Sequence, residues 1–400
     1  MITLGTVDRG IPESAIGDYV KRANRLTGVS DWKRLRGDGA EDWRDFRTAD
    51  PGDIGVAQLQ GFLRDAGFLP DGRIDGICGY RTAAAIRLFQ EYVRSVEGDA
   101  GIGMPDGQLG PKSAGHVRRW QAAHKRADWV GLEAAATPAY ARWMAFLHRV
   151  RDHRRAHSDR LSSLVQAWTA SSDTVRPAAW DLDPRRIHFV GIRRNVPQSG
   201  QQVYDNVFIL LVRGLAFRFL GSTDPGHTTN PRGFPFLVPG QHEYRFGWHK
   251  QTYHALKPAG GGVLVVRSRD VAFTEEDLAS GLERNNTINV HWGGEGLAGV
   301  VGKWSEGCQV IAGKGYFNHL GRAVDCTRFA ATTSAQLGTR IDGVYQTRGA
   351  YTLLADLGAA FSAGTDNTVR YTLLTGDDLA LAPDIAREVD ETRRALQAIR

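Results

Sequence analysis

Two stretches decide the fold of the C-terminal half: residues 288–294 read INVHWGG and residues 301–311 read VGKWSEGCQVI. The first predicts a strand over residues 287–291 that ends at His291, and the second places Cys308 in a turn after Gly307, before another apolar run. Cys308 stands seventeen positions after His291, so the intervening loop is long enough to bring imidazole and thiol together. A cysteine with a histidine as general base forms a thiolate nucleophile. The pair alone is weak evidence, because most such residues are a buried thiol and a core histidine.

The whole string resembles the catalytic signature of the L,D-transpeptidases, and the resemblance spans roughly residues 186–375. It implies that Cys308 is the acyl-accepting nucleophile and His291 its base, and that Ser305 and Gly307 shape the pocket and the oxyanion site. Gly307 should leave the backbone amides near Cys308 free to face an oxyanion. The resemblance also implies that Trp304 and His249 line the substrate cleft.

Two positions depart from the family pattern. Glu306 and Val310 stand where most members carry basic residues around the nucleophile. Another cation must then bind the carboxylate of the donor peptide, and Arg267 and Arg269 on a neighbouring predicted strand are the candidates. Relaxed donor selection is the expected consequence.

A repeat occupies the N-terminal half. The residues of the first copy are Asp75, Gly76, Gly79, Thr82, Phe89 and Gln90. Equivalent residues recur 31 positions later, at 106–107, 110, 113, 120 and 121. Glycines permit a tight turn, the hydroxyl residue caps the next helix, and the aromatic residue lies two helical turns into the core. Two copies of this unit predict a small helical bundle.

These residues resemble the peptidoglycan-binding domain, a three-helix module common in cell-wall enzymes, over about residues 54–95 with an extension to about 122. The resemblance implies that the six residues listed above belong to a peptidoglycan-binding site. Cys78 departs from the pattern by replacing an apolar or aromatic residue, and we interpret it as a small buried hydrophobe.

The composition is that of a soluble globular chain too long for one core. Of 400 residues, 42% are hydrophobic and 24% charged, and the net charge of +6 favours anionic partners without choosing among them. The sequence contains no apolar run of membrane-spanning length and no typical secretory signal, so membrane insertion is not expected and any export would use another route. Three scattered cysteines leave at least one free thiol.

The predicted fold class is α+β and multidomain: a small helical-bundle wall-binding domain followed by a mostly β L,D-transpeptidase-like domain. The predicted parts are an N-terminal extension at 1–49, the peptidoglycan-binding domain at 50–125, a solvated and charged helical linker at 126–180, the catalytic domain at 181–378 and a C-terminal helix at 379–400. Strands are predicted at 187–192, 207–212, 215–220, 263–266 and 370–374, with a turn at 213–214.

The leading functional hypothesis is a peptidoglycan-modifying enzyme that forms a thioester on Cys308 and needs no cofactor. Resolution by an amine would give L,D-transpeptidation or exchange of a D-amino acid, and resolution by water would give an L,D-carboxypeptidase or endopeptidase, for example a secreted antibacterial effector or a phage lysis factor. The partner would be peptidoglycan, either in the bacterial envelope or outside the producing cell. The sequence leaves the oligomeric state undetermined.

Two other functional classes compete with this hypothesis. A non-catalytic wall-binding protein is disfavoured by the intact His291 and Cys308. A zinc peptidase would need metal ligands, and the candidates are His242, His249, His254 and His291. Their spacing matches no known metal-binding motif, so this class is ranked last. Nucleic-acid binding would rest on net charge alone, so no such partner is predicted.

Overall fold

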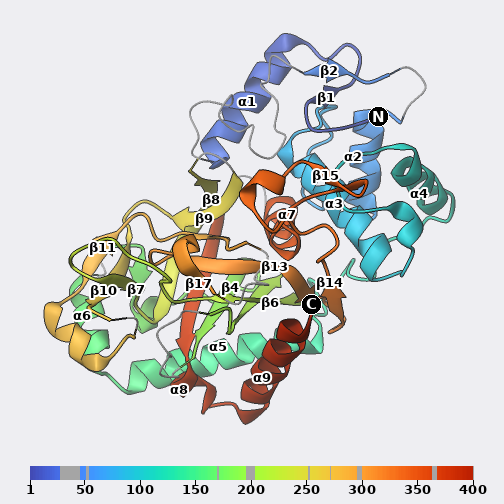
Figure 1. Ribbon diagram of the computed structural model, residues 1–400. Coiled ribbons are helices and arrows are strands. Elements are labelled where there is room, and N and C mark those ends of the chain that lie inside the picture. The colour runs from blue at the N-terminus through green and yellow to red at the C-terminus, as the bar shows by residue number, and fades with distance from the viewer. Residues whose placement is uncertain are drawn as a thin grey trace.

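A computed structural model describes residues 1–27, 46–50, 54–168, 171–194, 203–250, 253–270, 272–294, 300–362 and 367–399. The chain is a mixed α+β protein in which an N-terminal helical part lies against a larger part built on a curved sheet (Figure 1). Among the described residues, no helix has the length and apolar character needed to cross a membrane. The tryptophans of the N-terminal extension, Trp32 and Trp43, lie outside the described residues.

The N-terminal extension forms strand β1 (Thr6–Val7), helix α1 (Glu13–Thr27) and strand β2 (Arg47–Thr48), which pairs in parallel with β1. The apolar face of α1 packs on residues of both larger parts. It contacts a cluster that includes Ile77 of the repeat and Trp248 of the C-terminal part. The extension is therefore part of the folded body.

Three helices form the bundle that the repeat predicts: α2 (Val56–Asp65), α3 (Tyr80–Ser95) and α4 (Pro111–Ala122), with a short 3-10 turn η3 (Ala100–Ile102). Phe89 and Trp120, the aromatic residues of the two repeat copies, meet edge to face with ring centroids 5.2 Å apart. Both are buried. Their equivalent positions thus build one aromatic core.

The C-terminal part is organised around a closed sheet. Neighbouring strands of this sheet follow the order β12-β9-β8-β17-β4-β5-β6-β13, and β12 also pairs with β13, which closes the sheet. The strands are β4 (Ile187–Arg193), β5 (Asn206–Val212), β6 (Leu215–Ser222), β8 (Gly240–His249), β9 (Tyr253–Pro258), β12 (Val290–Trp292), β13 (Gln309–Phe317) and β17 (Thr368–Thr375). Strand β14 (Ala323–Asp325) pairs antiparallel with β13, and β3 (Thr174–Val175) pairs antiparallel with β8.

The hairpin between β5 and β6 turns at Arg213 and Gly214, which both have positive φ. The sequence places the neighbouring strands correctly. The strand predicted at 287–291 is instead β12, which starts three residues later.

A second, smaller sheet has the order β11-β10-β7, with β7 (Phe234–Leu237), β10 (Val263–Ser268) and β11 (Glu283–Asn285). Helix α6 (Arg160–Trp168) and the 3-10 helix η5 (Glu275–Ser280) pack on it. Short elements complete the chain: η4 (Pro177–Ala179), η6 (Gly302–Trp304), η7 (Ser334–Gln336), the hairpin β15 (Arg340–Ile341) with β16 (Val344–Tyr345), and α8 (Gly376–Leu379).

Helix α5 (Pro138–Ala156) differs from the solvated linker expected over 126–180. Together with α9 (Pro383–Ala398) it covers the outside of the closed sheet (Figure 1). Trp143, Leu147 and Val150 are fully buried against strand residues. Its charges serve the same packing, because Arg154 makes two hydrogen bonds to the Asp378 carboxylate. The apolar residues at positions i, i+4 and i+7 form a stripe that buries the helix despite its many charged residues.

Helix α7 (Ala350–Phe361) joins the two large parts by packing against α3. Arg87 of α3 makes two hydrogen bonds of 2.7 Å to the Asp356 carboxylate of α7, and Arg81 donates to backbone carbonyls at the end of α7. One continuous core cluster contains residues of the bundle and of the closed sheet. The wall-binding and catalytic parts expected from the sequence therefore share a core.

Candidate active site

Cys308 and His291 lie at the seam where the closed sheet is completed. In the parallel pair, His291 of β12 is opposite Val310 of β13, and the Gln309 amide donates to the Asn289 carbonyl at 2.8 Å. Side chains alternate along a strand, so residues two apart share a face. Cys308, two residues before Val310, therefore lies on the same face of the seam as His291.

The thiol of Cys308 is half-buried, whereas Cys78 and Cys326 are buried. Its Sγ accepts a hydrogen bond from the Asn289 amide and donates one to the Thr287 carbonyl, both at 3.4 Å. Burial raises the pKa of the Cys308 thiol to about 11, so the resting group is a protonated thiol at neutral pH. Among the three cysteines it alone is accessible enough for chemistry.

His291 is held as a neutral imidazole. Burial lowers the pKa of His291 to about 3. Its Nδ1 lies 2.7 Å from the Trp292 carbonyl, which only accepts, so Nδ1 carries the proton and Nε2 is left as the basic nitrogen. The Tyr253 hydroxyl lies 3.2 Å from the same Nδ1, and the His249 ring stacks on the His291 ring at 4.1 Å. Three groups thus fix the plane of the ring.

The turn before the thiol is built on Ser305 and Gly307. Ser305 Oγ donates to the Cys308 carbonyl at 2.7 Å and accepts from the Gly307 amide at 3.1 Å. Gly307 has φ +122°, and a Cβ there would lie 2.7 Å from the Pro235 carbonyl oxygen. Ser305 uses the Gly307 amide, so that amide is not available to an oxyanion. The Cys308 amide, in contrast, donates none of the hydrogen bonds found among the described residues.

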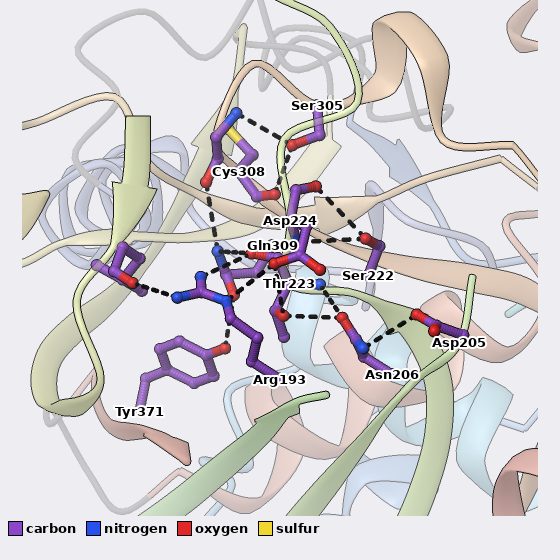
Figure 2. A network of polar contacts seen from close by, with 12 residues as sticks. Arg193, Asp205, Asn206, Ser222, Thr223, Asp224, Ser305, Cys308, Gln309 and Tyr371 are labelled. Atoms are coloured by element: carbon purple, nitrogen blue, oxygen red, sulfur yellow. Dashed lines mark hydrogen bonds and ion pairs between the residues drawn. The ribbon is translucent and has the colours of Figure 1, made fainter. Parts of the chain in front are cut away.

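A buried polar network lies directly beneath this turn (Figure 2). Arg193 at the end of β4 pairs with Asp224 at 2.9 Å and donates to the Thr223 carbonyl. The Gln309 side chain donates to the Thr223 and Gly307 carbonyls, and the Tyr371 hydroxyl donates to it. This network fixes the backbone on both sides of Cys308. Sequence reasoning missed these roles, although a charged arginine ending an apolar strand was a signal for Arg193.

The other residues predicted to bind substrate fall in different places. Trp304 packs on Trp292, with ring centroids 4.9 Å apart, near the end of β12. Arg267 is committed to Glu283 and to the Gly233 carbonyl, and Arg269 is an exposed residue after β10. The structure therefore stacks His249 on His291 and packs Trp304 on the adjacent Trp292, while Arg267 is already paired.

The sequence also missed Lys250. This exposed residue follows His249 in the turn after β8. Its positive charge contributes to the lowered pKa of His249 and His291 and opposes the raised pKa of Cys308. Burial is the largest cause of all three pKa shifts, and Lys250 is a cation close enough to favour the thiolate of Cys308.

The predicted peptidoglycan-binding residues build the loops of the bundle. The Gln60 side chain donates to Asp75, to the Ile77 carbonyl and to Thr82, and it accepts from the amides of Asp75 and Gly76. Gln90 repeats this arrangement with Asp106, Gln108 and Ser113. Gly79 packs on Tyr19 and is the N-cap of α3, which has no side-chain cap hydrogen bond, so the expected capping by Thr82 is wrong. Phe89 is buried. In this structure the repeat glutamines hold loops and use their polar atoms internally.

Among the described residues, no group of three or more histidine, cysteine, aspartate or glutamate side chains could hold a metal ion. The four histidines weighed for zinc are dispersed. His242 is bonded to Thr174 and the Val238 carbonyl, and His254 packs on Trp248. Only His249 and His291 of that set stack together.

One cavity lies between the bundle and the closed sheet, with a lining that includes Tyr80, Arg87, Trp248, Tyr253 and Arg348. Neither Cys308 nor His291 lines it. Tyr253 separates this cavity from His291, to which its hydroxyl is bonded. The cavity is therefore separate from the seam that carries Cys308 and His291.

Comparisons of the chain with protein-family models, with curated proteins and with solved structures found no match.

Proposed function

We propose that the protein is a cysteine acyltransferase that acts on the L,D peptide bond of peptidoglycan stem peptides in the bacterial envelope. The observation that carries the proposal is the seam: a half-buried thiol and a neutral histidine lie on one face of neighbouring strands, and a buried network fixes the turn that carries the thiol. The substrate class comes from the resemblance of the 288–311 string to the L,D-transpeptidases.

The reaction follows from the protonation states. His291 Nε2 removes the thiol proton as Sγ attacks the carbonyl carbon, which avoids a free thiolate in the resting site. The C–N bond then breaks, the departing amine of D-alanine takes the proton from His291, and a thioester remains on Cys308. The Cys308 amide is the donor available for the oxyanion. An acceptor amine next attacks the thioester and the proton returns to sulfur, whereas attack by water gives the acid.

Intact-mass measurement after incubation with a purified tetrapeptide stem tests the proposal. We expect an adduct of the tripeptide acyl group on the wild-type chain and none on Cys308→Ala. His291→Ala should slow adduct formation by about 100-fold to 10,000-fold. Cys326→Ala serves as the matched control because it removes a buried thiol elsewhere. Equal adduct on Cys308→Ala would contradict the proposal.

The acceptor decides between transfer and hydrolysis. Excess D-amino acid with tetrapeptide monomers distinguishes three products: dimers indicate transpeptidation, exchanged stems indicate small-amine acceptance, and tripeptides alone indicate a carboxypeptidase. Glu306 is acidic and Val310 is apolar, so neither supplies the cation that the family places there. We therefore expect exchange and hydrolysis to compete with cross-linking.

The bundle of residues 50–125 is proposed to bind peptidoglycan. Because it shares a core with the closed sheet, the test uses the full chain and purified sacculi. We expect co-sedimentation that weakens with salt, since exposed charges are screened beyond about 8 Å at physiological ionic strength. Absence of binding at low salt would contradict this role.

A further inference from the structure

Asn289 joins the thiol to the paired histidines. It immediately precedes β12, and its carbonyl accepts from the Gln309 amide next to Cys308. Its own amide donates to Cys308 Sγ at 3.4 Å. Its side-chain Nδ2 lies 3.2 Å from Nδ1 of His249, which stacks on His291. Asn289 therefore touches the nucleophile through its backbone and His249 through its side chain.

The side chain of Asn289 is only half satisfied. Burial lowers the pKa of His249 to about 4, so the ring is neutral and its Nδ1 lone pair can accept from Nδ2. The residue is 8% exposed, and its Oδ1 is a buried acceptor for which the described residues provide no partner. Unpaired buried acceptors are uncommon and costly in folded proteins. A partner that arrives with a ligand accounts for this one.

The partner must be a donor. An amide oxygen only accepts hydrogen bonds, so a carbonyl or carboxylate of a ligand cannot pair with it. A peptide that presents a carbonyl to Cys308 also carries backbone N–H groups next to that carbonyl, whereas an ester lacks the N–H at the replaced position. The geometry thus selects secondary amides close to the attacked bond.

We infer that Asn289 is a substrate-binding residue whose Oδ1 accepts a hydrogen bond from one backbone N–H of the bound peptide beside the carbonyl that Cys308 attacks. This inference rests on the proposed function and deepens it, because it makes a specific peptide N–H part of substrate selection. Asn289 lies within the 288–294 stretch, but the resemblance assigns it no role.

The test compares the tetrapeptide stem with analogues in which each amide N–H in turn is N-methylated. The variant is Asn289→Leu, which keeps the size and the backbone amide but removes both polar atoms. Rates of acyl-enzyme formation are measured, together with binding to the same variants carrying Cys308→Ala. For the wild type, we expect methylation at one position to weaken the reaction by about tenfold to 100-fold, the size of one lost hydrogen bond. In Asn289→Leu, the unmodified peptide should already show that loss, and methylation at that position should add nothing.

Asn286→Leu is the matched control, since it makes the same change at an exposed position three residues earlier. Alkylation of Cys308 by iodoacetamide should proceed equally in all variants, because the thiol contact comes from the Asn289 backbone. Methylation losses that are the same in wild type and Asn289→Leu at every position would overturn the inference.

The two proposals fail in different ways. Acylation without any coupling between Asn289 and an N–H refutes the inference alone. Peptide binding to the Cys308→Ala chain that shows the coupling, with no adduct on the wild type, refutes the proposed reaction alone. A tetrapeptide that neither binds nor reacts refutes both.

Discussion

Replacing Gly307 with alanine should disrupt the turn that carries the nucleophile. A Cβ at this position would lie 2.7 Å from the Pro235 carbonyl oxygen and 2.9 Å from Ile288 Cδ1, and the backbone has φ +122°. The backbone conformation costs about 1–3 kcal/mol for a residue with a side chain, and forced contact with rigid neighbours adds about 1–3 kcal/mol. The expected loss in free energy of unfolding is therefore about 2–6 kcal/mol.

Gly240→Ala separates the two contributions. Gly240 also has positive φ, at +142°, but a Cβ there would meet nothing within 4 Å. Its loss should be limited to the backbone cost of about 1–3 kcal/mol. Both variants are compared by denaturant unfolding and by the rate at which iodoacetamide labels Cys308. Equal destabilisation, or an unchanged labelling rate in Gly307→Ala, would refute the argument that β7 confines the turn.

Three further outcomes are expected. Because the pKa of Cys308 is raised to about 11, the thiolate fraction and the alkylation rate should rise about tenfold per pH unit from pH 7 to pH 10, and a plateau near pH 8 would contradict the burial argument. Gln90→Leu should lose about 1–3 kcal/mol of stability because a buried loop loses its clamp, whereas half-buried Gln121→Leu should stay within about 0.5 kcal/mol, and equal losses in denaturant unfolding would contradict the clamp. Asp356→Leu should destabilise the chain by about 1–3 kcal/mol because it leaves Arg87 without its carboxylate partner. The double variant with Arg87→Met should recover part of that loss, and no recovery in denaturant unfolding would contradict the importance of the pair.

Much of the local structure was predictable because short-range patterns determine it. The strands around residues 187–220 follow from apolar runs separated by the turn at Arg213 and Gly214. The helix from Pro383 follows from its start signal. The repeat predicted the bundle, because equivalent positions must form equivalent contacts.

The remaining features depend on contacts distant in sequence. Arg193 and Asp224 pair across 31 positions, and nothing near either residue indicates the other. The commitment of Arg267 to Glu283 likewise depends on how β10 and β11 pair. The apolar spacing of α5 indicates a buried face, but its many arginines led to the prediction of a solvated linker. Most of those arginines belong to the side of the helix that faces solvent.

The seam also makes the candidate site depend on long-range strand pairing. Strand β12 has three residues and contacts β9 on one side and β13 on the other, so the position of His291 relative to Cys308 is set by the pairing that closes the circle of strands. Strand β13 must in turn pair with β6, about ninety positions earlier in the chain. The relative positions of Cys308 and His291 consequently depend on strand pairings between distant parts of the chain. A chain in which β12 and β13 are unpaired would keep the Cys308 thiol without the neighbouring strand that carries His291.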